Sequence, residues 1–143
     1  MKKKSGLYIG ARLGSVLDER GAGQGGESLS GAVNRIGDRY GEIVRRSLPD
    51  MMPAEWCLLA DALNGVLHEP ASQIALLPAE VEDHIQLEGS DHKWSVDGEA
   101  LVERLRAMSY VERVAIVDVC ERFWLISRSD KRPPEDLFHD IIG

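Results

Sequence analysis

The sequence has 143 residues, enough for one domain or for one small domain with an extension. With 43% hydrophobic and 29% charged residues, the composition is typical of a globular protein and excludes an intrinsically disordered chain. The net charge of −7 is divided unevenly, because residues 1–46 carry nine Lys and Arg against five Asp and Glu, whereas residues 47–143 carry eight against nineteen. The second part would repel nucleic acid, and only the first part tolerates it.

Signals for targeting and for disulfide bonds are weak. No apolar run approaches the length of a membrane span, and no long apolar core follows the three N-terminal lysines. We therefore expect no signal peptide, no membrane association and a cytoplasmic location. Cys57 and Cys120 lie far apart in helical segments, so buried free thiols are expected rather than a disulfide framework.

Residues 6–13 alternate between apolar and other side chains. This period of two predicts a β-strand with one buried and one presented face. A lone strand leaves its backbone N–H and C=O groups without partners, and no second strand of similar quality follows. We therefore predict that the strand pairs with its copy in a second chain as an antiparallel ribbon across a two-fold axis. The strand side chains predicted to support this dimer are Leu7, Ile9 and Ala11.

The other face of the predicted ribbon carries Tyr8, Gly10 and Arg12. A two-stranded ribbon fits the major groove of DNA, where alternate side chains reach base edges. Tyr8 and Arg12 are the predicted readers of the bases, and Gly10 allows a close approach. The basic residues just before the strand are placed to meet phosphates, and they are Lys2, Lys3 and Lys4.

A helix is predicted over residues 29–46, after a short helical stretch at 15–20 and a glycine-rich break at 21–26. Ser28 and Ser30 are good capping residues at its start. Its apolar stripe recurs at intervals of four, three, four and three residues, at Leu29, Val33, Ile36, Tyr40 and Ile43. The helix also contains Gly31, Gly37 and Gly41. Each glycine costs roughly 1 kcal/mol relative to Ala, which indicates either close approach to a partner helix or a loosened helix.

This order of elements resembles the ribbon-helix-helix repressors, the Arc and MetJ superfamily, over about the first third of the chain. The resemblance is carried by the stretches Tyr8–Leu13 and Ser28–Ile36. It implies that Tyr8, Gly10 and Arg12 contact bases, and that the helix start at Ser28 and Ser30 holds a DNA phosphate through backbone amides. The helix residues assigned to the dimer are Val33, Ile36 and Tyr40. The chain departs from the family in its short first helix, its glycine-rich connection and the missing side chain at Gly10.

Pro49 ends the helix, and the break at Ser47–Asp50 separates a domain at 1–46 from one at 47–143. Pro53 suits the first turn of the next helix, whose stripe contains Trp56, Leu59, Ala60 and Leu63. Further helical pieces are expected at 70–77 and 79–87, whereas residues 88–96 are predicted to form a loop.

Asp97 is placed to cap a helix that carries Leu101, Leu105 and Met108 on one face. Ser109 and Glu112 have the spacing of a capping box, and the helix that they start is apolar on most sides through residue 126. It is the predicted core of the C-terminal part. A last helix at 135–142 is expected to dock through its apolar side chains, or else to act as a peptide-like ligand for the groove of a partner.

Little in the sequence indicates catalysis. Residues 21–26 match the dinucleotide-binding pattern G-x-G-x-x-G, but no strand leads into them and no βαβ unit surrounds them, so a flexible turn is the better interpretation. The histidines and cysteines lack zinc-site spacing. We therefore expect no cofactor, no metal and no enzymatic activity.

The three tryptophans are candidates for core residues or interface anchors. The neighbouring apolar stripes favour a core position for Trp56 and Trp124. Trp94 lies in a polar stretch and is either an exposed anchor or a core residue.

The predicted fold is mainly α, with an N-terminal β-strand in an intersubunit ribbon and a helical C-terminal part. The first functional hypothesis is a dimeric, sequence-specific transcriptional regulator that binds double-stranded DNA as a homodimer or a higher even oligomer. The resemblance extends it to an autorepressor or antitoxin-like protein of a mobile element, with the acidic part used for assembly or for a protein partner. The alternative is a protein-interaction or inhibitor module that acts through its acidic helical surface. An enzyme of unknown chemistry stands third.

Overall fold

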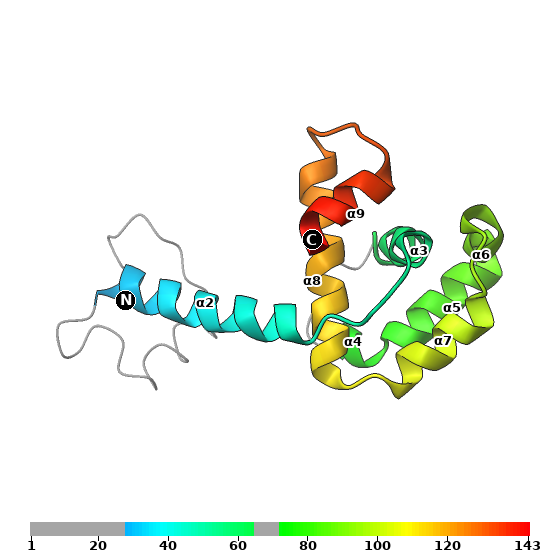
Figure 1. Cartoon of the computed structure of the whole chain (residues 1–143). Coiled ribbons are helices and arrows are strands. Elements are labelled where there is room, and N and C mark those ends of the chain that lie inside the picture. Colours follow the sequence, from blue (N-terminus) through cyan, green and yellow to red (C-terminus); the bar gives the residue numbers. More distant parts are fainter. Residues whose placement is uncertain (1–27, 65–71) are drawn as a thin grey trace. The chain divides into compact units, whose positions relative to one another are not determined.

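The structure, a computed structural model, describes residues 28–64 and 72–143 (Figure 1). Every regular element in these two ranges is an α-helix, and neither range contains a strand. The predicted fold class, mainly α with an N-terminal strand in an intersubunit ribbon, was therefore wrong, because the part of the chain that is described is entirely helical. The reason is that apolar side chains there recur at helical spacing, so the backbone groups pair inside helices. Residues 6–13, 15–20 and 21–26 lie outside the described residues.

The chain divides into two compact units, Met1–Ile43 and Val44–Gly143. The first unit is described from residue 28 onward, where it consists of most of helix α2 (Leu29–Arg46). The hydroxyl oxygen of Ser28 accepts a hydrogen bond of 3.0 Å from the N–H of Gly31, which confirms Ser28 as a capping residue. Helix α2 is amphipathic, and Tyr40 and Ile43 of its apolar stripe are 47% and 52% exposed.

Two glycines inside α2 occupy open positions. A Cβ atom added at Gly37 or Gly41 would meet no atom within 4 Å beyond the neighbouring backbone of its own helix. We therefore expect Gly37→Ala and Gly41→Ala to stabilise α2 by roughly 1 kcal/mol each, seen as a stronger helical circular dichroism signal and a higher unfolding midpoint. Sedimentation measured in parallel provides the control. Weaker self-association of the alanine variants would show instead that the glycines serve close approach to a second helix.

The second unit contains seven helices among its described residues, and their bounds are α3 (Pro53–Leu63), α4 (Ser72–Ala75), α5 (Leu77–Glu88), α6 (Ser90–Trp94), α7 (Gly98–Ala107), α8 (Tyr110–Ser127) and α9 (Pro134–Ile142). Two predicted helix starts are confirmed. The carboxylate of Asp97 accepts a hydrogen bond of 3.1 Å from the N–H of Ala100. Ser109 accepts from the N–H of Glu112 at 3.2 Å, and Glu112 accepts from the N–H of Ser109 at 3.0 Å.

The predicted loop at residues 88–96 was wrong, because this segment contains the end of α5 and the short helix α6. Gly89 has a φ of +65° and donates its N–H to the carbonyl oxygen of Ile85 at 2.9 Å, which ends α5. Ser95 ends α6 with a φ of +56°. A helix of five residues between two left-handed residues is too short to produce a readable apolar period, so the pattern did not show it.

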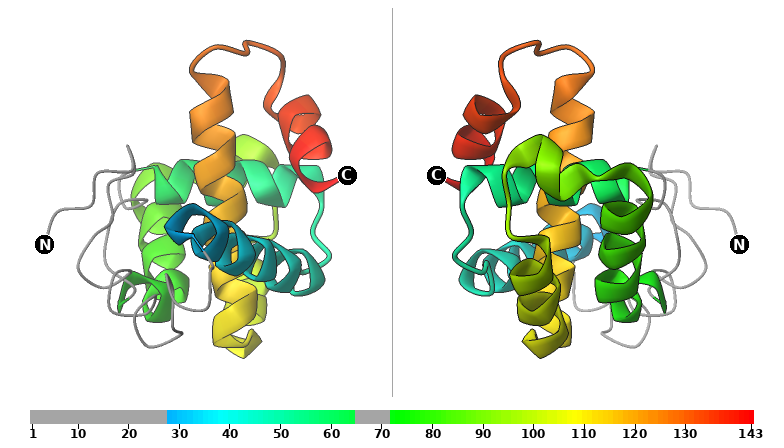
Figure 2. Two further views of the ribbon diagram at one scale, coloured as in Figure 1. Left: turned by 90° about the vertical axis from the view of Figure 1, so that its left-hand side faces the viewer. Right: turned by 90° about the vertical axis from the view of Figure 1, so that its right-hand side faces the viewer.

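Helix α3 is the centre of the second unit. It packs against α5, α6, α8 and α9, and it crosses α8 steeply, being seen almost end-on in Figure 1 and lengthwise in Figure 2. Six of its eleven residues are buried, and they are Trp56, Cys57, Leu58, Leu59, Ala60 and Leu63. A single apolar stripe was predicted for α3, whereas the helix is buried on several sides.

Helix α8 is the longest helix of the second unit among the described residues. It buries Ala115, Ile116, Val119, Cys120 and Phe123. Its apolar residues Val111, Leu125 and Ile126 stay exposed. The helix predicted as the core therefore contributes to the core on one side, and α3 is the more completely enclosed element.

Helices α5 and α7 lie side by side (Figure 1). Gly98, at the start of α7, permits a close approach, because a Cβ atom added there would lie 3.0 Å from the Cβ of Asp91 and 3.1 Å from the Cδ1 of Ile85. Any side chain at position 98 would push these neighbours apart.

The junction of α4, α7 and α8 is held by one guanidinium group. Arg113 of α8 donates to the carbonyl oxygens of Leu105 at 3.2 Å, Ala75 at 3.0 Å and Arg106 at 3.2 Å. These carbonyls belong to the last turns of α7 and α4, where few backbone N–H donors remain. The carbonyl oxygen of Leu105 also accepts from the N–H of Met108 at 3.2 Å. A cation at this place also favours both helix dipoles.

Candidate functional site

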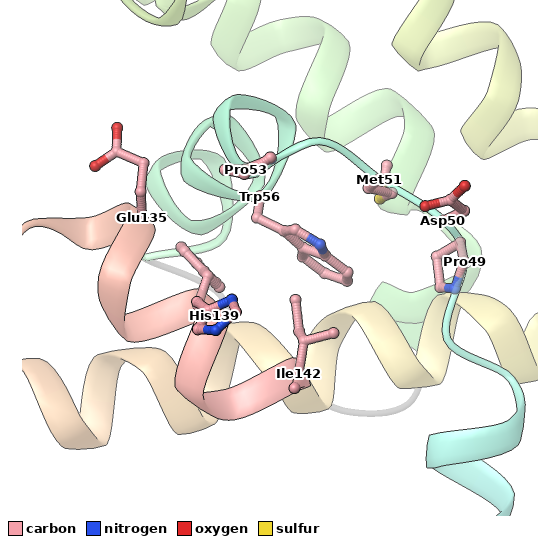
Figure 3. Close-up of a pocket in the computed structure, with 10 residues that line it drawn as sticks. Pro49, Asp50, Met51, Pro53, Trp56, Glu135, His139 and Ile142 are labelled. Carbon is pink, nitrogen blue, oxygen red and sulfur yellow. The ribbon is translucent and has the colours of Figure 1, made fainter.

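An apolar groove with a volume of about 230 Å³ opens beside Trp56 in the second unit (Figure 3). The connection before α3, the start of α3 and one face of α9 form it. Its apolar lining consists of Pro49, Met51, Pro53, Trp56, Phe138 and Ile142. Small-molecule sites usually measure about 300–1,000 Å³, so this groove is suited to one or two side chains rather than to a cofactor. We refer to it as the Trp56 groove.

The floor of the Trp56 groove is an aromatic stack. Phe138 of α9 lies between Trp56 of α3, with ring centres 6.0 Å apart and planes at 22°, and Phe123 of α8, with ring centres 4.4 Å apart and planes at 4°. Phe138 is 1% exposed and Trp56 is 2% exposed. Offset aromatic pairs at these separations stabilise beyond their buried area. The docking predicted for the last helix is therefore present, and it shapes the groove.

The indole N–H groups of the three tryptophans differ in their partners. Trp94 Nε1 donates to Asp61 Oδ2 at 2.7 Å, and Trp124 Nε1 donates to the carbonyl oxygen of Ala60 at 3.0 Å. The N–H of Trp56 has no acceptor among the residues that the structure describes, although this residue is buried. A buried donor without an acceptor costs roughly 1–3 kcal/mol. Trp94 is a half-buried residue packed against the core, not a free anchor.

The orientation of Trp56 directs this unpaired donor toward the groove. Figure 3 shows its ring extending among the labelled lining residues, with the nitrogen-bearing edge on the side of Met51. An occupant of the groove is therefore offered one hydrogen-bond donor next to an apolar surface.

Two carboxylates flank the groove on opposite sides of Trp56, Glu135 at the start of α9 and Asp50 before α3 (Figure 3). Neither side chain forms an ion pair with another described residue. Arg104 contacts the backbone carbonyl oxygen of Asp50 at 2.6 Å, but its charge is compensated by Glu55 at 2.7 Å. The rim of the groove is thus acidic.

Several basic side chains of the second unit form ion pairs with carboxylates of the same unit. Ion pairs join Lys93 to Asp61 at 3.0 Å, Arg122 to Asp118 at 3.2 Å and Arg132 to Asp140 at 2.7 Å. Arg106 pairs with both Glu82 and Glu103. Several exposed carboxylates have no ion pair with a described residue, namely those of Asp83, Glu88, Glu99, Glu121 and Asp136. The electrostatic potential at the surface of the second unit is therefore negative.

A second hollow, of about 380 Å³, lies along α5 and α7. It is lined by Glu82, Glu99, Glu103 and Arg106 among others. Arg106 pairs with Glu82 and Glu103, whereas Asp91 and Glu99 have no ion pair with a described residue, so this hollow is a polar, net acidic depression that differs from the mainly apolar Trp56 groove.

Both cysteines are buried free thiols, as predicted. Burial raises the pKa of Cys57 to about 12, with smaller contributions from Glu135 and Asp61, and burial also raises the pKa of Cys120. At pH 8 the Cys57 side chain is then almost entirely the protonated thiol, which is the unreactive form.

We therefore expect neither thiol to react with a disulfide reagent at pH 8 while the chain is folded. Both should react at once in concentrated urea, which serves as the control. Rapid reaction of a thiol in the native protein would contradict this and would show that α3 or α8 opens locally.

The histidines are not gathered into one site. His84 and Ser90 share a hydrogen bond of 3.0 Å, whereas His92 and His139 are exposed. Within residues 28–64 and 72–143 no three His, Cys, Asp or Glu side chains are arranged to hold a metal ion. No helix in the same ranges is long and apolar enough to cross a membrane.

Most residues predicted to contact DNA lie outside the described part of the chain, namely Lys2, Lys3, Lys4, Tyr8, Gly10 and Arg12. The same holds for Leu7, Ile9 and Ala11 of the predicted dimer. Ser28 and Ser30 stand exposed at the start of α2, and Val33, Ile36 and Tyr40 lie along it. Their roles in DNA binding and dimerisation stay predictions.

The Trp56 groove was not predicted from the sequence. Trp56, Phe138 and the two rim carboxylates come from segments about eighty residues apart, so no local spacing connects them. The one available signal was the apolar side chains of the last helix, which predicted docking but no cavity.

No protein-family model, curated protein or solved structure matches this chain.

Proposed function

We propose that this chain is a regulator that acts by binding another protein through the acidic surface of its second unit. The observation that supports this most is the imbalance of charge there. The cations Lys93, Arg104 and Arg106 are paired with carboxylates of the same unit, whereas many exposed carboxylates have no such pair. A surface of this kind attracts a basic partner and repels nucleic acid.

The interior of the second unit supports a binding role over a chemical one. Its buried thiols have raised pKa values, and the Trp56 groove has apolar walls. We therefore propose that the protein has no enzymatic activity. Free cysteines persist in a reducing compartment, so we also propose that the protein acts in the cytoplasm.

The proposal is tested by capturing proteins from the source cells with the full chain and with a charge-reversed variant, Asp83→Lys with Glu88→Lys and Glu121→Lys. A true partner binds the parent chain, is lost from the variant, and dissociates as salt rises. The matched control is Tyr8→Ala with Arg12→Ala, which we expect to keep the partner. Partners that bind the parent and the charge-reversed chain equally would refute the proposal.

A second candidate function is DNA binding by residues 1–46. It is favoured by the excess of basic residues in this part, nine Lys and Arg against five Asp and Glu. The test is binding of the protein to a fluorescent duplex that carries its own upstream region, beside an unrelated duplex, over a range of salt. Under this function the variant Tyr8→Ala with Arg12→Ala loses DNA binding while its oligomeric state is unchanged. Unaltered DNA binding by this variant would contradict the assignment of the two readers.

A further inference from the structure

We propose that the Trp56 groove binds a short segment of a partner protein in which one large apolar side chain lies next to Lys or Arg. This inference rests on the proposed function, because it names the kind of segment that the acidic unit recognises and the place where it binds.

The size and lining of the groove indicate a side chain as the occupant. Its volume of about 230 Å³ and its walls of Met51, Pro53 and Ile142 offer an apolar space below the size of an ordinary cofactor site. The floor is fixed by the stack of Trp56 on Phe138. Because the pocket is preformed, its residues need little ordering when an apolar side chain enters. The burial of that side chain therefore contributes efficiently to binding.

The unpaired indole N–H of Trp56 indicates a hydrogen-bond acceptor in the occupant. Trp94 and Trp124 have acceptors at 2.7 and 3.0 Å, whereas Trp56 is 2% exposed and has none among the described residues. A backbone carbonyl oxygen of a bound segment, next to the apolar anchor, would satisfy this donor. A purely hydrocarbon ligand would leave the donor unsatisfied.

The charges at the rim define the flanks of the segment. Asp50 and Glu135 lie on opposite sides of Trp56 and have no ion pair with a described residue (Figure 3). Basic residues beside the anchor would meet them, while acidic flanks would be repelled. Such rim charges mainly contribute specificity and a faster association rate.

The experiment selects peptides that bind the full chain from a library of twelve-residue peptides with a central Leu or Phe and random flanks. Selected peptides are then measured for affinity to the parent chain and to two matched variants. Ile142→Lys places a charge in the groove at a residue that is 37% exposed, and Leu87→Lys places the same charge on α5 at a residue that is 81% exposed. Circular dichroism checks that both variants stay folded.

We expect the selected peptides to carry Lys or Arg near the central residue. Ile142→Lys should weaken their binding at least tenfold, which corresponds to about 1.4 kcal/mol, and Leu87→Lys less than twofold. The double variant Asp50→Lys with Glu135→Lys should weaken binding several-fold and remove most of its salt dependence.

A ¹⁵N–¹H correlation NMR spectrum contains one indole N–H signal for each of the three tryptophans. The signal of Trp56 reports directly on the hydrogen bond that its indole is proposed to donate to the peptide. The signal lost in Trp56→Phe is the one from Trp56. On addition of a selected peptide, this signal should move to the position typical of a hydrogen-bonded indole, while the signals of Trp94 and Trp124 stay in place, because their donors are already bonded.

Four outcomes would overturn the inference. They are failure to enrich basic peptides, peptide binding that Ile142→Lys leaves intact, an unmoved Trp56 signal, or self-association that Ile142→Lys abolishes, which would assign the groove to a second copy of this chain. If salt-sensitive partners are still lost on reversing Asp83, Glu88 and Glu121, the proposed function stands and only the groove is wrong. If neither experiment yields a partner, both proposals fail.

Discussion

Replacing Phe138 by alanine is expected to lower the free energy of unfolding by about 3–5 kcal/mol, the usual cost of removing a buried phenylalanine ring. Phe138 is 1% exposed and lies between the rings of Trp56 and Phe123. Its loss removes two ring contacts at once and leaves a cavity at the place where α9 docks on α3 and α8. Urea unfolding followed by tryptophan fluorescence measures the change.

The matched control for Phe138→Ala is Ile142→Ala on the same helix. Ile142 is 37% exposed, so its truncation removes less buried surface and should cost about 1 kcal/mol or less. A loss below about 1 kcal/mol for Phe138→Ala would mean that α9 does not hold this position in solution. The shape of the Trp56 groove would then need revision as well.

Replacing Arg113 by alanine is the second change with a large expected effect, a loss of about 2–3 kcal/mol in the free energy of unfolding. A hydrogen bond that involves a charged group contributes about 1.5–3 kcal/mol to the free energy of unfolding. The contributions of several bonds made by one side chain are not additive, so the expected loss is close to that of a single bond. The carbonyl oxygens of Ala75 and Arg106 would lose the guanidinium donor, and that of Leu105 would keep only the N–H of Met108. Urea unfolding again provides the measurement.

Two further variants separate the geometry of Arg113 from its charge. Arg113→Lys keeps the positive charge, but an ammonium group lacks the planar fork, so we expect it to recover about half of the loss or less. Arg122→Ala removes an exposed arginine of the same helix that pairs with Asp118 at 3.2 Å, and it should cost under about 0.5 kcal/mol. Equal effects of Arg113→Ala and Arg122→Ala would show that the three carbonyls find other donors.

Local signals predicted the helices well. Ser28, Asp97 and Ser109 were identified as capping residues from their neighbours within three positions, and each accepts the expected backbone N–H. Apolar spacing predicted the helices that begin at Pro53, Gly98 and Tyr110. These features depend on interactions inside one helix, so a single sequence contains them.

Features that depend on distant residues were not predictable in this way. The short helix α6 depends on the left-handed residues Gly89 and Ser95. The role of Arg113 depends on where the ends of α4 and α7 lie. The Trp56 groove depends on bringing α9 against α3. The alternating pattern of residues 6–13 was read as a strand without knowledge of any partner, and the described part of the chain contains only helices.

The central position of α3 has a consequence for the order of folding. Helices α5 and α7 are close in the chain and pack on each other, so they need only a short loop to close. Helix α3 instead packs on α5, α6, α8 and α9, and its contact with α9 joins residues 56 and 138. Because contacts between distant residues form late in folding, we expect a hairpin of α5 and α7 to form first. The amide protons of α3 should then exchange with solvent only when the whole unit unfolds.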